Sequence, residues 1–413
     1  MKINDKEKKI LDGVYGYFPQ WAIKQQIKVG EFFDADQFIQ VSECHLCADT
    51  ESVGENIIEE LEQLYISDNK KTKVIIPSIT DPRGTDPKCL EKIGHDYQIL
   101  KIENKLSNLL SSLGFSMTNT CINYQVITKP SFGQSLAYGD TGSVIFANSI
   151  CGARSNFEGG PAALAASLTG LVPEYGFHLD HIRQPNILFN CELDLKDLSD
   201  YGALGAFIGR SVSGYWDVPL IKFSKTTKPT TDELKHLGTS LASYGSVALF
   251  HIDELTPESF DKKIYNTNKI KSEILVTNKN INKIYEEEDF EGNKPDVVVF
   301  SAPQLSENEV VNIHQLLGER KLKIPILISI PPVIKNFFEN SDILDNMEKK
   351  GVIIVEGGCF YQMYANIIRE KMGWNNLISN SAKLVNILKG YGYKTSLRTT
   401  NQAVESAITG KLL

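Results

Sequence analysis

The sequence predicts an α/β protein in which parallel sheets are covered by helices and the functional site lies in a cleft between domains. Two observations support this fold class. From about residue 232, short apolar runs such as VVVF and ILISI alternate with amphipathic helical patterns, which is typical of parallel sheets covered on both faces. Before that, residues 118–217 are rich in glycine and polar residues and have weak periodicity. A long stretch of this kind inside a compact domain usually forms a site.

The chain of 413 residues is too long for one ordinary hydrophobic core. We therefore divide it into an N-terminal α/β portion, residues 1–230, which includes the glycine-rich block, and a C-terminal α/β portion, residues 231–413. The first portion opens with a helix that is interrupted between Gly13 and Pro19. The elements expected after it are a strand at QFIQVSECHL, a helix at GENIIEELEQLYI, a strand at KVIIPSI, a helix at ENKLSNLLSSLG that ends at Gly114, and a strand-like run at INYQVIT.

The C-terminal portion is expected to hold one parallel sheet between about Asp232 and Gly358. It begins with a helix over residues 232–243. The strands expected are SVALFHI, EILVT, PDVVVF, IPILISI and GVIIVEGG, with helices at SENEVVNIHQLLGE and KNFFENSDILDNMEKKG. Ligands of such sheets bind beyond the carboxyl ends of the strands. By this rule, His251, residues 301–304 and residues 357–359 are candidate ligand-binding positions, because they lie at the ends of predicted strands.

Composition and charge exclude several classes of protein. The net charge is −8, and no basic stripe with interleaved aromatic residues occurs, so nucleic acid is not an expected partner. No stretch reaches the ~18 apolar residues that a membrane-spanning helix needs. The N-terminus lacks the apolar region of a secretory signal, so we expect a cytoplasmic protein without a membrane partner. Seven scattered cysteines do not suggest a disulfide framework.

The stretch FANSICGARSNFEGG, residues 146–160, is the first candidate binding segment. Its arginine, Arg154, offers a planar donor fork that suits a carboxylate or a phosphate, and Asn148 and Ser149 precede it. The alternative is a tight turn with an exposed arginine. Ser381 and Lys383 follow an asparagine-rich turn, which indicates either an anion-binding cradle or a capped helix start.

Four further residues are candidates for chemistry. Asp140 lies in a segment of small polar residues, although an aspartate there more often caps a turn. His45 follows a predicted strand, where a single histidine is usually structural. Cys121 and Cys359 each lie beside a turn, and each is either a ligand for iron or a buried thiol. His178 and His181 form a metal-binding pair only if that segment is helical.

Taken together, these segments resemble the aconitase X family in its large-subunit form. The resemblance rests on LDGVYG, CHL at 44–46, TCINY at 120–124, the block from PSFGQ through DTGSVIFANSICGAR to YGFHLDHIR, and DELKHLGTSLASYGSVALFHI with TPES after it. It continues with GGC at 357–359, NSAKL at 380–384 and AVESAITG near the end. The ordered set covers nearly the whole chain.

The resemblance implies a hydro-lyase with an aconitase-like architecture. Family members remove water from cis-3-hydroxyproline or from mevalonate 5-phosphate, and an iron–sulfur cluster or an iron ion holds the leaving hydroxyl. Cys121 and Cys359 are then the metal ligands, and Arg154, Asn148, Ser149, Ser381 and Lys383 are substrate-binding candidates. Asp140 and His45 are the candidate catalytic residues.

Three departures from the family pattern leave the cofactor open. The family's Gly-Cys-Pro-His stretch reads Ser301-Ala302-Pro303-Gln304 here, so a cysteine and a histidine are missing. Gln134 replaces a glutamate, and Asp140-Thr141-Gly142 replaces Glu-Ser-Ser. An iron site with two thiols, a site completed by His45, and a site without metal all remain possible.

The resemblance also implies a partner chain. Family members close their site with a small swivelling domain, which carries a catalytic serine, and the sequence ends without room for it. We therefore expect a heterodimer whose large subunit dehydrates a small hydroxy acid or its phosphate. The alternatives are a diverged homologue with metal-independent lyase or isomerase activity and a non-catalytic subunit that binds a ligand or partner.

Overall fold

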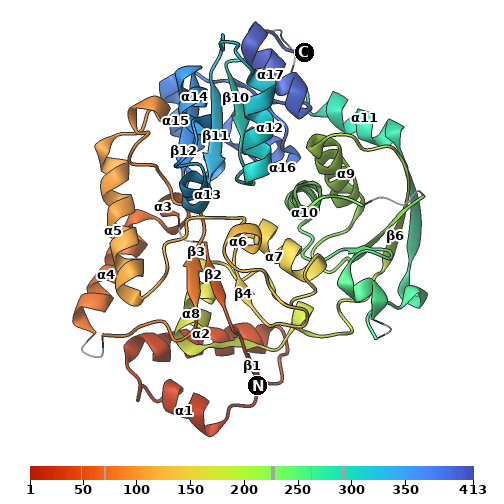
Figure 1. Ribbon diagram of the computed structural model, residues 1–413. Helices are drawn as coiled ribbons and strands as arrows, with labels where there is room; N and C mark the ends of the chain where they lie inside the picture. Colours follow the sequence, from red (N-terminus) through yellow and green to blue (C-terminus); the bar gives the residue numbers. More distant parts are fainter. Residues whose placement is uncertain (48, 69–70, 225–227, 262, 291, 293) are drawn as a thin grey trace.

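Three parallel sheets organise the chain in the computed structural model, which describes residues 1–413 except 48, 69–70, 225–227, 262, 291 and 293. Figure 1 shows them as three regions: a blue sheet at the top, a green one at the right and short orange and yellow strands near the centre. Helices flank each sheet. The predicted α/β class with parallel sheets is therefore confirmed.

The sheet at the top of Figure 1 has five parallel strands in the order β12-β11-β10-β13-β14. Its central strand β10 is apolar along its whole length, and β11 is apolar except for Ser329, because helices cover both faces. The strands are β10 (Val297–Phe300), β11 (Ile326–Ile330), β12 (Val352–Glu356), β13 (Asn376–Ser379) and β14 (Lys394–Leu397). The helices are α12 (Glu307–Leu317), α13 (Pro332–Phe337), α14 (Ile343–Lys349), α15 (Ala365–Met372), α16 (Ala382–Leu388) and α17 (Thr400–Thr409).

A second parallel sheet has the order β8-β7-β6-β9. Its strands are β6 (Ile187–Glu192), β7 (Pro219–Phe223), β8 (His251–Ile252) and β9 (Ser272–Thr277), and its helices are α9 (Leu198–Ser211), α10 (Thr231–Gly245) and α11 (Asn278–Glu287). The expectation of one continuous sheet from Asp232 to Gly358 is therefore wrong. The strands expected at SVALFHI and EILVT pair with β7, which lies directly after the glycine-rich block, and with β6, which lies toward the end of that block, instead of with β10.

The remaining strands belong to the first 173 residues. A short parallel sheet has the order β3-β2-β4, and β1 pairs with β5 in an antiparallel ladder. The strands are β1 (Phe38–Gln40), β2 (Cys44–Leu46), β3 (Ser78–Thr80), β4 (Ala137–Tyr138) and β5 (Leu171–Pro173). The helices are α1 (Asp5–Leu11), α2 (Tyr17–Phe32), α3 (Thr50–Val53), α4 (Glu55–Ser67), α5 (Tyr97–Leu113), α6 (Asn123–Val126), α7 (Thr141–Ser149) and α8 (Gly160–Thr169).

Three local expectations for this region are wrong. KVIIPSI, expected as a strand, contributes only its last two residues to β3, and residues 73–77 are not in a strand. QFIQVSECHL, expected as one strand, is divided between β1 and β2, because each half finds a different partner strand. The strand-like run INYQVIT contains the helix α6 instead. Short apolar runs do not distinguish a strand from a buried helix by periodicity, and the tertiary contacts decide. Gly114 does end α5 in the left-handed conformation, with φ 97°.

Candidate active site

The carboxyl ends of two parallel sheets supply the polar groups of one buried cluster. In the three-stranded sheet β3-β2-β4, Cys47 follows β2, Asp81 follows β3 and Asp140 comes two residues after β4. In the five-stranded sheet Cys359 follows β12 and Lys383 follows β13. Gly357, with φ 70°, allows the turn that leads from β12 to Cys359. These groups therefore lie beyond the carboxyl ends of both sheets, which is where parallel sheets usually bind their ligands.

The buried thiols of Cys121 and Cys359 lie close enough to each other that each shifts the pKa of the other. This contact raises the pKa of Cys121 above its ordinary value, and burial adds to the increase. Burial alone would raise the pKa of Cys359 as well. The Cys121 thiol, the charge of Lys383 and the Ser301 hydroxyl outweigh burial, so the Cys359 pKa is lowered.

Lys383 supplies the positive charge beside this pair. Its ammonium lies 3.4 Å from Oδ1 of Asp140, and both side chains are buried. It also lies 5.5 Å from the centre of the Tyr361 ring, within the range of a cation–π contact. Burial would lower the pKa of Lys383, but the Asp140 carboxylate and the two thiols raise it. The other carboxylate oxygen of Asp140 accepts the backbone N–H of Ser143 and caps α7.

Asp81 is a second buried carboxyl group in the cluster. Its Oδ2 accepts the Cys47 thiol at 3.2 Å and the Gln362 amide at 2.8 Å. Burial, together with the charge of Asp140, raises its pKa well above the ordinary value. His45 Nε2 lies 2.8 Å from the carbonyl of Thr120 and 3.6 Å from Asp81 Oδ1. Burial lowers the pKa of His45, so its ring stays neutral.

Several buried polar atoms of the cluster have no partner within the described part of the chain. They include His45 Nδ1, Asp81 Oδ1 and Gln362 Oε1. Buried groups of this kind cost free energy unless water or a ligand pairs them. The unpaired atoms lie beside the thiol and carboxylate groups, so a polar ligand or water molecules could pair with them.

The donor set does not fit an iron–sulfur cluster held by three thiolates. Cys121 and Cys359 supply two thiols, and position 302 is an alanine with no exposed surface. Among the described residues, no group of three or more His, Cys, Asp or Glu side chains has the geometry of a metal site. All seven cysteines are free thiols.

The candidate binding residues of FANSICGAR contact other protein groups. Asn148 bonds to both backbone groups of Ser155 and to the carbonyl of Ala248. Ser149 Oγ accepts the N–H of Phe250. Arg154 donates to the carbonyl of His178 at 2.7 Å and pairs with Asp180, and a fifth of its side chain remains exposed. Ser381 caps α16 and donates to the carbonyl of Ala302 at 2.7 Å.

A different arginine joins the motifs of this region. Arg183 is fully buried, and it forms two hydrogen bonds with Glu258 at 2.6 and 2.8 Å. It also donates to the carbonyls of Phe177, Asn148 and Ala153. The segments FANSICGAR, YGFHLDHIR and TPES are therefore held together by one guanidinium group.

The histidines of YGFHLDHIR do not form a helical metal-binding pair. His178 ends a short 3₁₀ turn and is buried, whereas His181 is exposed. Burial and the charges of Arg183 and Arg154 lower the pKa of His178 to about 3. His178 is therefore a neutral interior residue.

Glu158, in the same block, makes stability depend on pH. It is buried, its Oε1 has no partner among the described groups, and burial raises its pKa to about 7. The folded state therefore holds this proton up to higher pH than the unfolded state, whose carboxyl titrates near the ordinary value of 4.5. Stability should fall as pH rises between these two values, by roughly 3 kcal/mol over the whole titration.

We expect Glu158→Gln to match the wild type near pH 4 and to be more stable at pH 8. Denaturant unfolding at a series of pH values measures the difference. Burial raises the pKa of Glu103 to about 7 as well. The variant should therefore still lose some stability as pH rises. If the free energy of unfolding changed with pH in the same way in both proteins, this account of Glu158 would be contradicted.

Sequence reasoning missed Asp81 and the residues after Cys359. Asp81 follows β3 directly, so the rule about strand ends would have found it if the short strand Ser78–Thr80 had been placed correctly. Tyr361 and Gln362 lie in a 3₁₀ turn that carries no motif. Their contacts with Lys383 and Asp81 come from the tertiary fold alone.

Comparison with known proteins decides the family. Three family models match consecutive parts of the chain: the aconitase X first domain over residues 1–181, the second domain over 185–286 and the third domain over 295–409. The chain belongs to the aconitase X family. Cys121 and Asp140 lie in the first of these aconitase X domains, and Cys359 and Lys383 lie in the third.

Two kinds of aconitase X relative are similar over most of the chain. The phosphomevalonate dehydratase large subunit of Thermococcus kodakarensis is 29% identical over 98% of this chain and 100% of the relative. That of Methanosarcina mazei is 31% identical over 77% and 76% of the two chains. The cis-3-hydroxy-L-proline dehydratase of Pseudomonas aeruginosa is 24% identical over 97% of this chain and 69% of its own length.

A solved structure agrees with the fold. The crystal structure of Thermococcus kodakaraensis aconitase X in its holo-form matches with a TM-score of 0.87 and 27% identity. The match covers 98% of this chain and 100% of the solved one. None of the helices in the described ranges is both long and apolar enough to cross a membrane.

Proposed function

We propose that this chain is the large subunit of a hydro-lyase that removes water from a small hydroxy acid or a phosphorylated hydroxy acid. The names of its relatives support this reaction class. The observation that carries the proposal is the buried cluster in which the Lys383 ammonium meets the Asp140 carboxylate at 3.4 Å, beside two thiols. Unpaired polar atoms in the same cluster leave positions for a polar substrate.

Dehydration needs an acid that protonates the leaving hydroxyl and a base that removes a proton from the neighbouring carbon. We assign the acid to Asp81, because its raised pKa keeps the carboxyl protonated and its Oδ1 is free. His45 is neutral, and with Nε2–H donated to Thr120 its Nδ1 is an unpaired acceptor that can take a proton. Lys383 and Asp140 set the charge around the substrate, and the exposed part of Arg154 is available to an anionic group.

The active enzyme is proposed to be a heterodimer. The relatives from Thermococcus kodakarensis and Methanosarcina mazei are named large subunits, a name that implies a small one. Such a chain would cover the cluster.

A second candidate is a metal-independent lyase or isomerase of the same fold. Ala302 favours it, because this position offers no thiol between the two cysteine segments. The acid and base assigned above need no metal for an elimination at an already acidic carbon. A non-catalytic subunit is the third candidate, and no contact of the described residues favours it over the enzymes.

The test uses the full chain together with its small-subunit partner. Mevalonate 5-phosphate and cis-3-hydroxy-L-proline are supplied separately, and mass spectrometry follows the loss of one water. We expect dehydration of one of them, and Asp81→Asn should abolish it while Asp180→Asn, a change at the exposed partner of Arg154, should not. Rearrangement without loss of water would favour the isomerase, and no turnover of either substrate would contradict the proposal.

Iron content is a separate prediction. Two thiols are fewer protein ligands than a stable four-iron cluster requires, so we expect low, oxygen-labile iron in protein purified without oxygen. Any iron present should disappear in the double variant Cys121→Ser, Cys359→Ser. Elemental analysis provides the measurement, with Cys191→Ser as the control. Full, oxygen-stable iron that survives the double change would show that the metal is bound elsewhere.

A further inference from the structure

The segment Ser301–Gln304 lies between the two cysteines at the carboxyl end of β10. Gln304 has no exposed surface, and its backbone N–H points to Sγ of Cys121 at 3.4 Å. Ser301 Oγ donates to Sγ of Cys359 at 3.7 Å. One short segment therefore contacts both thiols.

The Gln304 side chain ties the backbones of both cysteine segments together. Its Oε1 accepts the N–H of Cys121 at 3.3 Å. Its Nε2 donates to the carbonyl of Asn119 at 3.2 Å and to the carbonyl of Gly358 at 3.0 Å. Asn119 lies two residues before Cys121, and Gly358 directly precedes Cys359. All three of these side-chain hydrogen bonds thus hold one thiol segment against the other.

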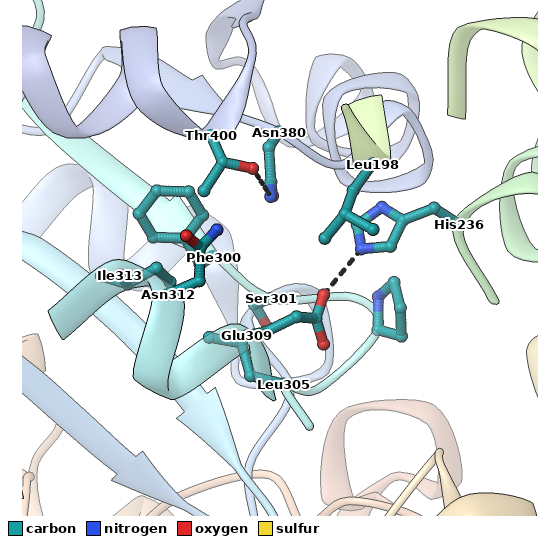
Figure 2. Close-up of a pocket in the computed structure, with 11 residues that line it drawn as sticks. Leu198, His236, Phe300, Ser301, Leu305, Glu309, Asn312, Ile313, Asn380 and Thr400 are labelled. Atoms are coloured by element: carbon teal, nitrogen blue, oxygen red, sulfur yellow. Dashed lines mark hydrogen bonds and ion pairs between the residues drawn. The ribbon is translucent and has the colours of Figure 1, made fainter. Parts of the chain in front are cut away.

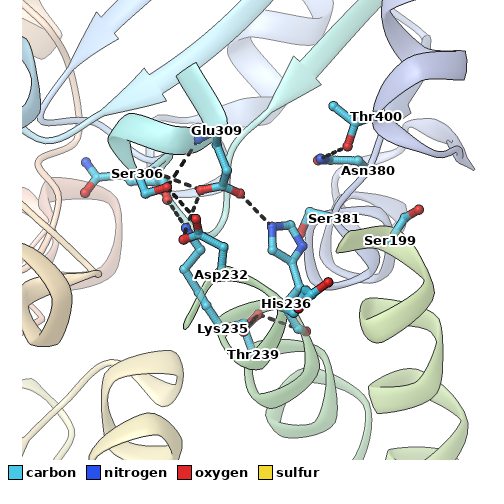
Figure 3. Close-up of polar contacts among 12 residues, drawn as sticks. Ser199, Asp232, Lys235, His236, Thr239, Ser306, Glu309, Asn380, Ser381 and Thr400 are labelled. Carbon is cyan, nitrogen blue, oxygen red and sulfur yellow. Dashed lines mark hydrogen bonds and ion pairs between the residues drawn. The ribbon is translucent and has the colours of Figure 1, made fainter. Parts of the chain in front are cut away.

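The second aconitase X domain holds this segment from the opposite side. Lys235, which is fully buried in α10, donates to the carbonyl of Gln304 at 3.3 Å. The same ammonium pairs with Glu309 and lies 3.1 Å from Asp232. Figure 3 shows Lys235, Asp232 and Glu309 converging, with Ser306 bonded to both carboxylates. The backbone of Gln304 is thereby anchored to a domain that contributes no thiol to the pair.

Side-chain packing does not fill all the space beside this segment. Ser301 and Pro303 line a small cavity of about 10 Å³, together with His236, Glu309, Asn380 and Thr400 (Figure 2). This is room for about one water molecule. On that side the segment depends on hydrogen bonds for its position.

We propose that Gln304 is a positioning residue that holds the segments of Cys121 and Cys359 against each other. Ser301 assists at Cys359 alone. The inference rests on the proposed function for its purpose, because a fixed thiol pair is useful only in a working site. The hydrogen bonds of Gln304 with the two cysteine segments do not depend on which reaction the enzyme catalyses.

The test measures how fast each cysteine reacts with iodoacetamide in the folded full-length chain, with mass spectrometry to locate the label. Gln304→Met keeps the side-chain volume and removes three hydrogen bonds. We expect labelling of Cys121 and Cys359 to accelerate about tenfold or more, because local opening becomes easier. Cys191, buried in β6, is the internal reference and should not change.

Ser301→Ala is the matched second variant. It removes the hydroxyl that contacts Cys359, so labelling should accelerate at Cys359 and not at Cys121. A rise at all three cysteines in both variants would show that the segment only supports the fold, and it would overturn the proposal. Unchanged labelling in both variants would overturn it too.

Activity separates this inference from the proposed function. In the assembled enzyme, Gln304→Met should lower kcat more than it changes KM, since the thiols move while the binding groups stay. If labelling changes as expected but neither substrate is dehydrated by the wild type, the positioning role stands and the proposed reaction fails.

Discussion

Replacing Glu258 by Gln should lower the free energy of unfolding by about 3–5 kcal/mol, because Arg183 would remain buried with an unpaired charge. Arg183 and Glu258 have 0% and 1% of their side chains exposed, so water cannot substitute for the carboxylate. The lost pair would also loosen the carbonyls of Asn148 and Ala153, which accept from the same guanidinium. Denaturant unfolding measures the change.

The control is an exposed pair of the same charge type. Lys283 and Glu287 lie 3.4 Å apart on α11 with 70% and 43% of their side chains exposed. Lys283→Gln should cost less than about 1 kcal/mol. Equal losses for the buried and the exposed pair would show that the Arg183 contact contributes little.

Replacing Lys383 by Met should reduce kcat/KM for the dehydration about 10²–10³-fold, as the loss of one electrostatic group in a water-excluded site does. The change removes the only cation that the described contacts place beside Asp140, Cys121 and Cys359. Steady-state kinetics of the assembled heterodimer provide the measurement. Lys394→Met, on an exposed position of β14, is the control and should retain the wild-type rate.

A loss of folding would mimic this result, and a double variant separates the two. Lys383→Met alone leaves the Asp140 carboxylate buried without its partner, whereas adding Asp140→Asn removes that unpaired charge. The double variant should therefore regain stability. It should not regain activity. Recovery of activity in the double variant would show that Lys383 serves the fold only.

Much of the framework could be predicted because strands buried on both faces are apolar throughout. VVVF, ILISI and VIIVE gave β10, β11 and β12 on this basis. Their partners could not be predicted, since β9 and β10 are consecutive predicted strands and yet join different sheets. Sheet membership depends on which strand edge is nearest in space, and local periodicity carries no information about that.

The candidate site divides in the same way. Cys359, Lys383 and Asp140 were candidates because they follow strands or turns with distinctive residues, and the structure brings all three into one cluster. Asp81 escaped notice because its strand has three residues. Arg154 stood out by motif, but the sequence gives no sign that Asp180 and the His178 carbonyl engage its guanidinium.

The origin of the cluster in two separate sheets has a consequence for folding. Cys121 and Cys359 belong to segments that are distant along the chain, and closing a loop of that size costs entropy before any contact compensates for it. Each sheet is built from neighbouring βα units, so each can form on local contacts first. The thiol pair comes into being only when the finished sheets dock, which makes the site one of the last parts of the molecule to form.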